Sequence, residues 1–199
     1  EIVCGYHGLR FNAEGKCTKI PAQPDLTKIS DRFSLTHFPV ILRYGLVWTS
    51  VHGRDFEHNN IPILDTWDDA EHQSILPAFV DIAGSSGRQL EGFIDVAHFA
   101  WVHHEAFADR DNPVVPKYHT EKTAYGLKST YISGVSNYPH ALKHLEPEGF
   151  EWKRTFEIYP PFSAILTVDF PENGVLKILN ACCPVSVNQT RLFVPLTRN

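Results

Sequence analysis

Residues 91–103 read Glu-Gly-Phe-Ile-Asp-Val-Ala-His-Phe-Ala-Trp-Val-His and combine apolar side chains with groups that can hold a metal. Asp95, His98 and His103 follow the pattern D-x-x-H-x-x-x-x-H. Two imidazoles with a nearby carboxylate are typical of a non-haem Fe(II) site. On a regular helix the two rings would point roughly 140° apart, so they converge only if the helix ends or widens between them. The alternative is that His98 is a core residue and His103 a polar helix end.

The surrounding residues 88–103 predict one helix, because apolar and polar side chains each recur at helical spacing. The apolar stripe comprises Leu90, Ile94, Ala97 and Trp101, and the polar stripe comprises Glu91, Asp95 and His98. Apolar residues also fill most of the remaining surface, so we expect the helix to be buried nearly all round, together with its acids and histidine. Ser85 or Ser86 is expected to cap its start.

A second motif lies near the start of the sequence, where Cys4-Gly-Tyr-His7-Gly8 forms a C-x-x-H. Thiolate and imidazole both bind metals, and this spacing lets one tight loop present both. Two ligands do not complete a zinc or iron–sulfur site, which needs two more. The alternative is a buried thiol beside a surface histidine.

The rest of the sequence predicts mostly strands. Hairpin strands are expected at 9–11 and 17–20, where Gly15 can adopt a positive φ, and two further strands at 38–42 and 45–48. The polar stretch 52–74 is the expected domain boundary. A strand over 74–81 precedes the helix. The sequence from residue 114 onward is β-rich, with a hairpin turn at 171–174.

Composition narrows the class of protein. The 199 residues are 43% hydrophobic and 21% charged, which suits a packed core. The net charge of −5 argues against nucleic-acid binding, and no apolar run approaches the roughly 18 residues of a membrane span. Four cysteines fit a reducing compartment, so we expect a cytoplasmic protein. The sequence contains no Met and begins and ends in predicted strands. We therefore expect that residues are missing at both ends.

Together the two motifs resemble the Rieske non-haem iron oxygenases of the α-subunit type. In that family a C-x-H and a C-x-x-H hold a [2Fe–2S] cluster, with two cysteines on one iron and two histidines on the other. Cys4 and His7 match the second pair. The family's iron motif, D/E-N-x-x-D-x-x-H-x-x-x-x-H, is matched by Glu91, Asp95, His98 and His103. The subtype looks similar to vanillate O-demethylase and dicamba monooxygenase.

The resemblance implies an α+β protein with two domains. Residues 1–54 would be the C-terminal half of an all-β Rieske [2Fe–2S] domain. Residues 55–199 would be a helix-grip (START/Bet v 1-like) catalytic domain with an antiparallel sheet, lacking its C-terminal part. Cys4 and His7 would hold the cluster, and His98 and His103 a mononuclear Fe(II). Asp95 would be a catalytic residue that links an iron histidine to a cluster histidine of the neighbouring subunit in a homotrimer; the alternative for Asp95 is a surface acid.

The function implied is that of a terminal oxygenase. It would use O₂, with electrons from NAD(P)H through a separate reductase, with or without a ferredoxin, to hydroxylate or O-demethylate a small aromatic or heterocyclic compound. Neither nucleic acid nor membrane is an expected partner. Glu91 would support the site by hydrogen bonding, His104 would lie near it, and Phe99 and Trp101 would line the substrate pocket.

Two departures from the family pattern matter. Gly92 stands where the family has Asn. The first C-x-H and the third iron ligand, an Asp on a C-terminal helix, have no counterpart within the 199 residues. The alternatives are a non-catalytic Rieske electron carrier and a helix-grip ligand-binding protein with a degenerate iron site. The number of irons per chain would distinguish them from an oxygenase. A zinc hydrolase built on His98 and His103 would leave Cys4 and His7 unexplained.

Overall fold

The computed structural model describes residues 1–52, 57 and 61–199. The chain forms two compact units, Glu1–His58 and Asn59–Asn199. The boundary predicted between residues 54 and 55 lies outside the described residues. Within the described ranges, no helix is both long enough and apolar enough to cross a membrane.

The first unit is built from short antiparallel strands. The first three strands form one sheet, and two later strands pair with each other: β1 (Ile2–Val3), β2 (Arg10–Phe11), β3 (Cys17–Lys19), β4 (Val40–Arg43) and β5 (Leu46–Thr49). A 3₁₀ helix, η1 (Asp31–Phe33), lies between the two groups. Gly15 turns the β2–β3 hairpin with φ +75°, as predicted. Tyr44 and Gly45 turn the β4–β5 hairpin with φ values of 58° and 70°, the left-handed turn that suits tightly joined strands.

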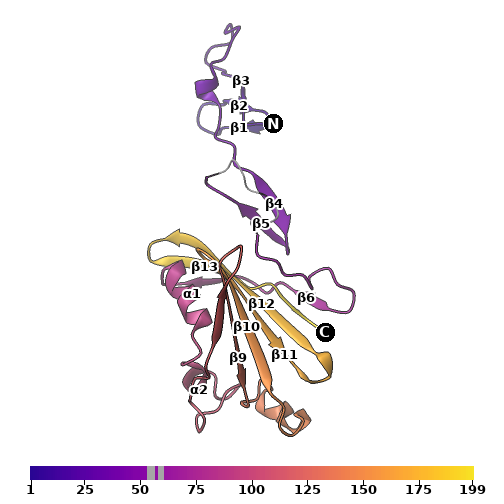
Figure 1. Cartoon of the computed structure of the whole chain (residues 1–199). Helices are drawn as coiled ribbons and strands as arrows, with labels where there is room; N and C mark the ends of the chain where they lie inside the picture. Colours follow the sequence, from indigo (N-terminus) through magenta and orange to yellow (C-terminus); the bar gives the residue numbers. More distant parts are fainter. Residues whose placement is uncertain (53–56, 58–60) are drawn as a thin grey trace. The chain divides into compact units, whose positions relative to one another are not determined.

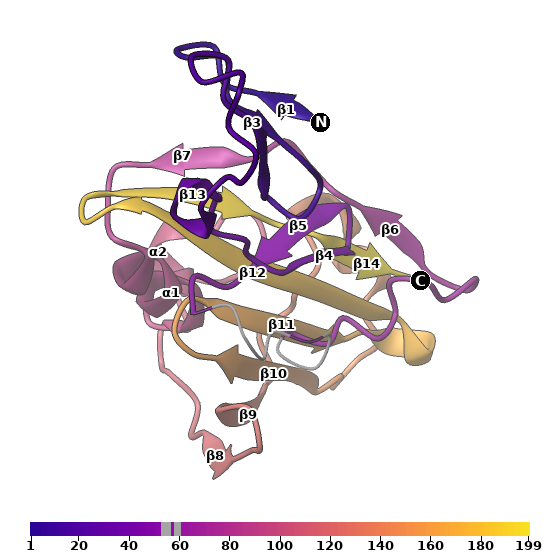
Figure 2. The same cartoon turned by 90° about the horizontal axis from the view of Figure 1, so that it is seen from above.

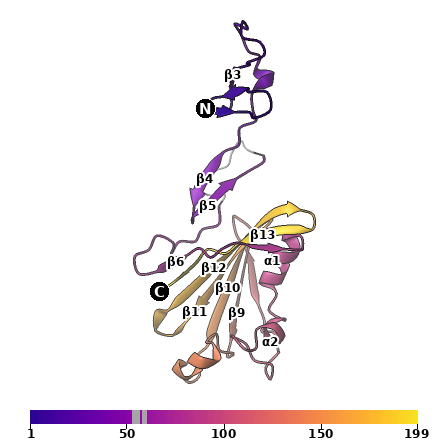
Figure 3. The same cartoon turned by 180° about the vertical axis from the view of Figure 1, so that it is seen from behind.

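The second unit is an antiparallel sheet of nine strands within the described residues, and strands β9–β12 lie side by side in it (Figures 1 and 3). The strand order is β6-β14-β12-β11-β10-β9-β8, and β13 pairs with β12 and β7. The strands are β6 (Gln73–Ile75), β7 (Val80–Ile82), β8 (His119–Lys122), β9 (Leu127–Ser133), β10 (Trp152–Tyr159), β11 (Ser163–Asp169), β12 (Val175–Ser186), β13 (Gln189–Phe193) and β14 (Leu196–Arg198). The predicted α+β class with an antiparallel sheet is confirmed.

Two connections in this sheet differ in detail from the sequence prediction. The 74–81 stretch forms two strands, β6 and β7, with Pro77 between them, because proline lacks the N–H that a continuous ladder needs. The β11–β12 hairpin turns at the predicted place, through the 3₁₀ helix η4 (Pro171–Asn173). Its positive φ falls on Glu172 and Asn173, not on the glycine that follows. A further 3₁₀ helix, η3 (His140–Leu145), precedes β10.

The predicted helix over 88–103 is in fact two helices, α1 (Ser86–Ile94) and α2 (Phe99–Val102), which lie on the same side of the sheet (Figure 2). Ser85 caps α1 by accepting the Arg88 N–H. Asp95 ends α1, because its backbone is extended (ψ 130°) and its side chain accepts the Ala97 N–H. A short polar side chain that bonds its own backbone competes with helix continuation.

The expectation that this segment is buried nearly all round is wrong for the described structure. Leu90, Val96 and Ala100 are buried, whereas Trp101 is 61% exposed and Val102 is 66% exposed. The break at Asp95 changes the direction of the chain, so residues four apart across it no longer share one face.

The main core lies on the face of the sheet against which Val96, between α1 and α2, packs. Trp152, Phe156 and Val168 are almost fully buried there, together with Tyr131 and Leu166. Trp152 and Phe156 are four positions apart on β10, so their side chains lie on the same face of the sheet. Phe93 from α1 packs edge-on against Phe156, with ring centroids 6.0 Å apart. This packing fixes the end of α1 and the segment that follows it against the sheet.

Replacement of Leu179 by alanine should lower the free energy of unfolding by about 2–5 kcal/mol. Leu179 on β12 and its cross-strand neighbour Ile165 on β11 are both fully buried, so the change leaves a cavity. Urea denaturation followed by tryptophan fluorescence measures the loss. Val187→Ala is the control, because Val187 is 82% exposed, and it should change stability by less than about 0.5 kcal/mol. Equal effects of the two changes would contradict the burial of Leu179 against its cross-strand neighbour.

Candidate metal centres

Cys4 and His7 lie on one tight loop between β1 and β2. The Cys4 N–H donates to the Leu9 carbonyl and the Gly8 N–H donates to the Cys4 carbonyl, each at 2.9 Å. Gly8 has φ +69°, and a Cβ built there would lie 3.1 Å from a Pro21 side-chain carbon. Glycine is therefore favoured at this position, and it closes the loop that presents both side chains.

The Cys4 thiol is exposed and sits near backbone donors. Backbone hydrogen bonds from Tyr6 and then His7 lower the pKa of the Cys4 thiol, against a smaller opposing effect of burial. Thiolate is the form of cysteine that binds a metal. The loop thus offers one thiolate and one imidazole, which is half of the donor set that a Rieske cluster requires.

Asp95 and His98 form a hydrogen-bonded pair at the break between the two helices. His98 Nδ1 lies 3.1 Å from Asp95 Oδ2, while Asp95 Oδ1 accepts the Ala97 N–H at 2.9 Å. Burial acts to raise the pKa of Asp95, but the Ala97 N–H and the His98 ring outweigh it, and the net shift is downward. An ionised Asp95 accepts a hydrogen bond from the protonated Nδ1 of His98. The other ring nitrogen, Nε2, then keeps its lone pair available for a metal.

The rings of His98 and His103 lie close together, with centroids 5.1 Å apart. They flank α2, since His98 is its N-cap and His103 its C-cap, so the helix does end before the second ring. Phe107 stacks on the His103 ring at 4.8 Å. Burial, and secondarily the charge of His98, lower the pKa of His103, which favours the neutral imidazole that binds metals.

Among residues 1–52, 57 and 61–199, no three His, Cys, Asp or Glu side chains gather in a way that could hold a metal. The two candidate centres therefore each supply part of a ligand set. Cys4 and His7 fit a Rieske cluster in donor chemistry, and His98 and His103 fit two of the three ligands of a non-haem iron site.

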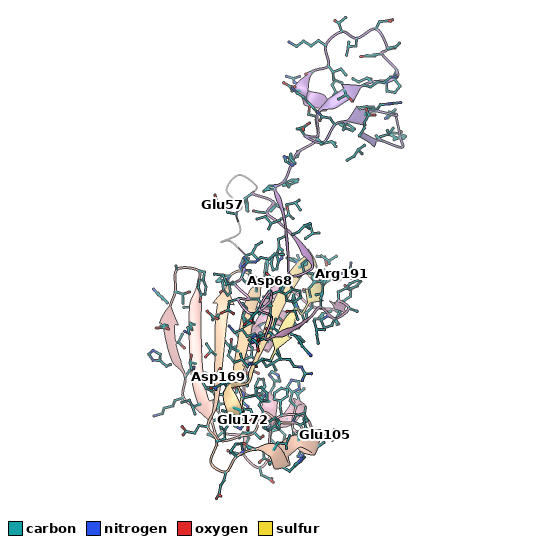
Figure 4. The ribbon with its side chains drawn as sticks, turned by 90° about the vertical axis from the view of Figure 1, so that its right-hand side faces the viewer. Glu57, Asp68, Glu105, Asp169, Glu172 and Arg191 are labelled. Atoms are coloured by element: carbon teal, nitrogen blue, oxygen red, sulfur yellow. The ribbon has the colours of Figure 1, made fainter. Side chains whose placement is uncertain are left out.

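Other residues in and beside the iron motif make contacts of their own. Glu91 pairs with Arg88 on the exposed side of α1, so the expected hydrogen bond into the site is wrong. His104 Nδ1 lies 3.1 Å from the Trp101 carbonyl, and its Nε2 lies 3.6 Å from the exposed Glu105 (Figure 4). Gly92 has open space around it, since a Cβ built there meets no atom within 4 Å.

The structure also shows residues that sequence reasoning missed. Arg154 on β10 and Tyr131 on β9 are cross-strand partners, each 3% exposed, and both line an open cavity that Phe99 and Phe107 also line. The available sequence signal was a charged residue within an alternating strand, Trp152-Lys-Arg154-Thr-Phe156. Trp101, expected in the pocket, is exposed, with the Arg110 guanidinium 5.9 Å from its ring centroid.

Comparison with known proteins supports the resemblance to Rieske oxygenase subunits. Residues 1–38 match the family described as the Rieske [2Fe-2S] domain. Methylxanthine N3-demethylase NdmB of Pseudomonas putida is 26% identical over 202 residues, covering 99% of this chain and 54% of the relative. The chain thus spans about half the length of this curated relative.

Solved structures of such enzymes share the fold. NdmA of Pseudomonas putida CBB5 with caffeine aligns with a TM-score of 0.79 and 22% identity, covering 98% of this chain and 55% of the other. Dicamba monooxygenase bound to dicamba aligns with a TM-score of 0.76 and 15% identity, covering 98% and 59%. The domain match over residues 1–38 and the related sequences therefore liken the chain to the oxygenase subunits of Rieske systems, and the solved structures show the same fold.

Proposed function

We propose that the protein is the terminal oxygenase of a multicomponent Rieske system that hydroxylates or demethylates a small aromatic or heterocyclic compound. The observation that carries this proposal is the His98–His103 pair, with rings 5.1 Å apart and with Asp95 hydrogen-bonded to the first ring. A Rieske electron carrier would not need this second group of metal-binding side chains.

Each candidate centre has its own residues. Cys4 and His7 would hold a [2Fe–2S] cluster, and His98 and His103 a mononuclear Fe(II). When bound, the cluster supplies single electrons and the iron activates O₂. Asp95 keeps the proton on His98 Nδ1 and so directs Nε2 toward the metal. Phe107 stacks on His103, which limits the rotation of that ring.

The expected redox partners and subunit assembly of this protein are taken from its resemblance to Rieske oxygenases. We expect electrons from NAD(P)H through a separate reductase, with or without a ferredoxin. We also expect residues 1–54 and 55–199 to act as the Rieske and catalytic domains. Asp95 is 47% exposed, so a neighbouring subunit can reach it, and we expect a closed homotrimer. Sedimentation of the full-length protein tests this, and a fully active monomer would contradict it.

The decisive experiment is metal analysis of the full-length protein with an activity assay. We expect about three irons and two sulfides per chain, since a [2Fe–2S] cluster and one mononuclear iron would both be bound. Oxygen consumption and product formation would be measured with NADH, a reductase and a panel of aromatic and heterocyclic compounds. Two irons per chain and no turnover would instead indicate an electron carrier, and sulfide-free protein containing zinc would overturn the proposal.

Replacement of Cys4 by serine should abolish the visible absorption of the cluster and remove about two irons per chain. A serine hydroxyl does not provide the thiolate that the cluster requires. Absorption spectra and iron analysis measure the loss. Cys183→Ser is the matched control, because Cys183 is also an exposed free thiol but lies on β12. Loss of the cluster in the control, or its retention in Cys4→Ser, would remove Cys4 from the site.

A further inference from the structure

An open cavity lies on the core face of the large sheet, beside the segment that follows α2. The space in it that a water-sized sphere can reach is about 40 Å³, roughly that of three waters, so a carboxylate group fits inside and the rest of a ligand lies at the open side. Much of its wall is apolar or aromatic, contributed by Val96, Phe99, Phe107, Val114 and Val115. Such a wall suits a small planar ring.

The cavity also contains a buried cation. Arg154 is 3% exposed and lies in register between Tyr131 on β9 and Val168 on β11. Its Nε and Nη2 donate to Asn137 Oδ1 at 3.2 and 3.0 Å, and Nη2 also donates to the Val135 carbonyl at 3.2 Å. These acceptors are neutral.

Within the described part of the chain, no carboxylate pairs with Arg154. Asp109 also lines the cavity, but its carboxylate accepts the Asp111 N–H. A buried charge without a counter-ion is costly. An anionic ligand in the cavity would provide the missing charge.

A second polar group next to Arg154 also lacks a partner. The Tyr131 hydroxyl is buried and makes no hydrogen bond to any described residue. The guanidinium carbon of Arg154 lies 5.7 Å from the Tyr131 ring centroid, so the two side chains are adjacent, without a hydrogen bond of ordinary geometry between them. Unpaired buried hydroxyls are rare in folded proteins, and a ligand oxygen would satisfy this one.

We propose that Arg154 and Tyr131 bind the carboxylate of a small aromatic acid whose ring lies against Phe99 and Phe107. The inference rests on the proposed function, because this acid would be the substrate class of the oxygenase. Phe99 and Phe107 also contact the His103 ring, with centroids 5.8 and 4.8 Å away. The same aromatic side chains therefore border the cavity and the imidazole pair. A neutral ring would leave the Arg154 charge uncompensated.

Calorimetric titration of the full-length protein with benzoate and with benzamide tests this proposal. The two probes have the same shape and differ in charge. Benzoate should bind at least about tenfold more tightly, as expected for hydrogen bonds to a charged group. Arg154→Gln should lower benzoate affinity by at least about tenfold on the same ground.

Tyr131→Phe is the sharper variant, because it removes only the unpaired hydroxyl. Benzoate affinity should fall by about tenfold, while the melting temperature of the ligand-free protein stays the same or rises. A merely structural hydroxyl would give the opposite pattern. Lys153→Gln is the matched control: Lys153 neighbours Arg154 on β10 but pairs with Asp169 (Figure 4) and is half exposed. The benzoate affinity of the Lys153→Gln variant should equal that of the unchanged protein.

Several outcomes would overturn the proposal: no benzoate binding, equal binding of benzoate and benzamide, or unchanged benzoate affinity in Tyr131→Phe. This test is separate from that of the proposed function, because benzoate binding is measured without turnover. A protein that binds benzoate through Tyr131 but holds no mononuclear iron would contradict the proposed function alone. A protein that oxidises neutral rings and ignores benzoate would contradict this inference alone.

Discussion

Replacement of His98 by alanine is expected to remove the mononuclear iron, about one iron per chain, and to reduce product formation to background. The visible absorption of the cluster should persist, since Cys4 and His7 belong to the other compact unit of the chain. The physical reason is that His98 and His103 are the two imidazoles expected to share this iron, and a single remaining imidazole binds it weakly. Iron analysis, absorption spectra and product formation are measured on the same preparation.

The matched control for this change is His104→Ala. His104 follows His103 directly, but its ring faces the Trp101 carbonyl and Glu105. The control should retain the iron. If His104→Ala lost the iron as His98→Ala does, His104 would be an iron ligand in place of His103. If His98→Ala lost the cluster as well, the two centres would not be independent.

Replacement of Asp95 by asparagine should leave both metal centres bound and lower turnover by roughly 10- to 100-fold, the usual effect of losing a partner that orients a metal-binding histidine. Asp95 Oδ2 holds His98 Nδ1 at 3.1 Å. Asparagine has nearly the same shape, but it lacks the charge and can present an N–H to this nitrogen. The ring would then lose the interaction that keeps its proton on Nδ1. Turnover and iron content per chain are the measurements.

A second Asp–His pair in the chain provides an unusually close control. Asp69 Oδ1 accepts the Glu71 N–H and its Oδ2 lies 3.0 Å from His72 Nδ1, the same arrangement as at Asp95. Asp69→Asn should match Asp95→Asn in any loss of stability but retain turnover. Equal activity of the two variants would show that Asp95 has no special role. Loss of iron in Asp95→Asn would place Asp95 closer to the metal than we propose.

Much of the fold could be predicted from local sequence signals. The hairpin at Gly15 and the turn at 171–174 form at the predicted positions, because glycine and asparagine tolerate a positive φ and proline fixes φ at about −65°. The cap at Ser85 also forms as predicted. Each of these features depends on a few adjacent residues, so it does not depend on long-range packing.

The helix over 88–103 was mispredicted because the spacing of its apolar and polar residues stays helical across the break. This spacing gives no sign of where the backbone leaves the helix. Asp95 fits the polar stripe of a continuous helix, yet its side chain bonds the Ala97 N–H and ends α1 there. The break also brings the His98 and His103 rings to the two ends of α2. The candidate residues were recognisable from the sequence, but their geometry depended on this local competition between side chain and backbone.

The sequence by itself determined the two motifs, their spacing and the family resemblance, since these require only residue identity and order. The tertiary structure alone decided which distant residues meet. Tyr131 and Arg154 are 23 positions apart and become neighbours only through the antiparallel register of β9 and β10. Burial of Arg154 without a carboxylate likewise depends on packing from several segments. Register and packing are long-range properties, so no local pattern could have predicted this pair.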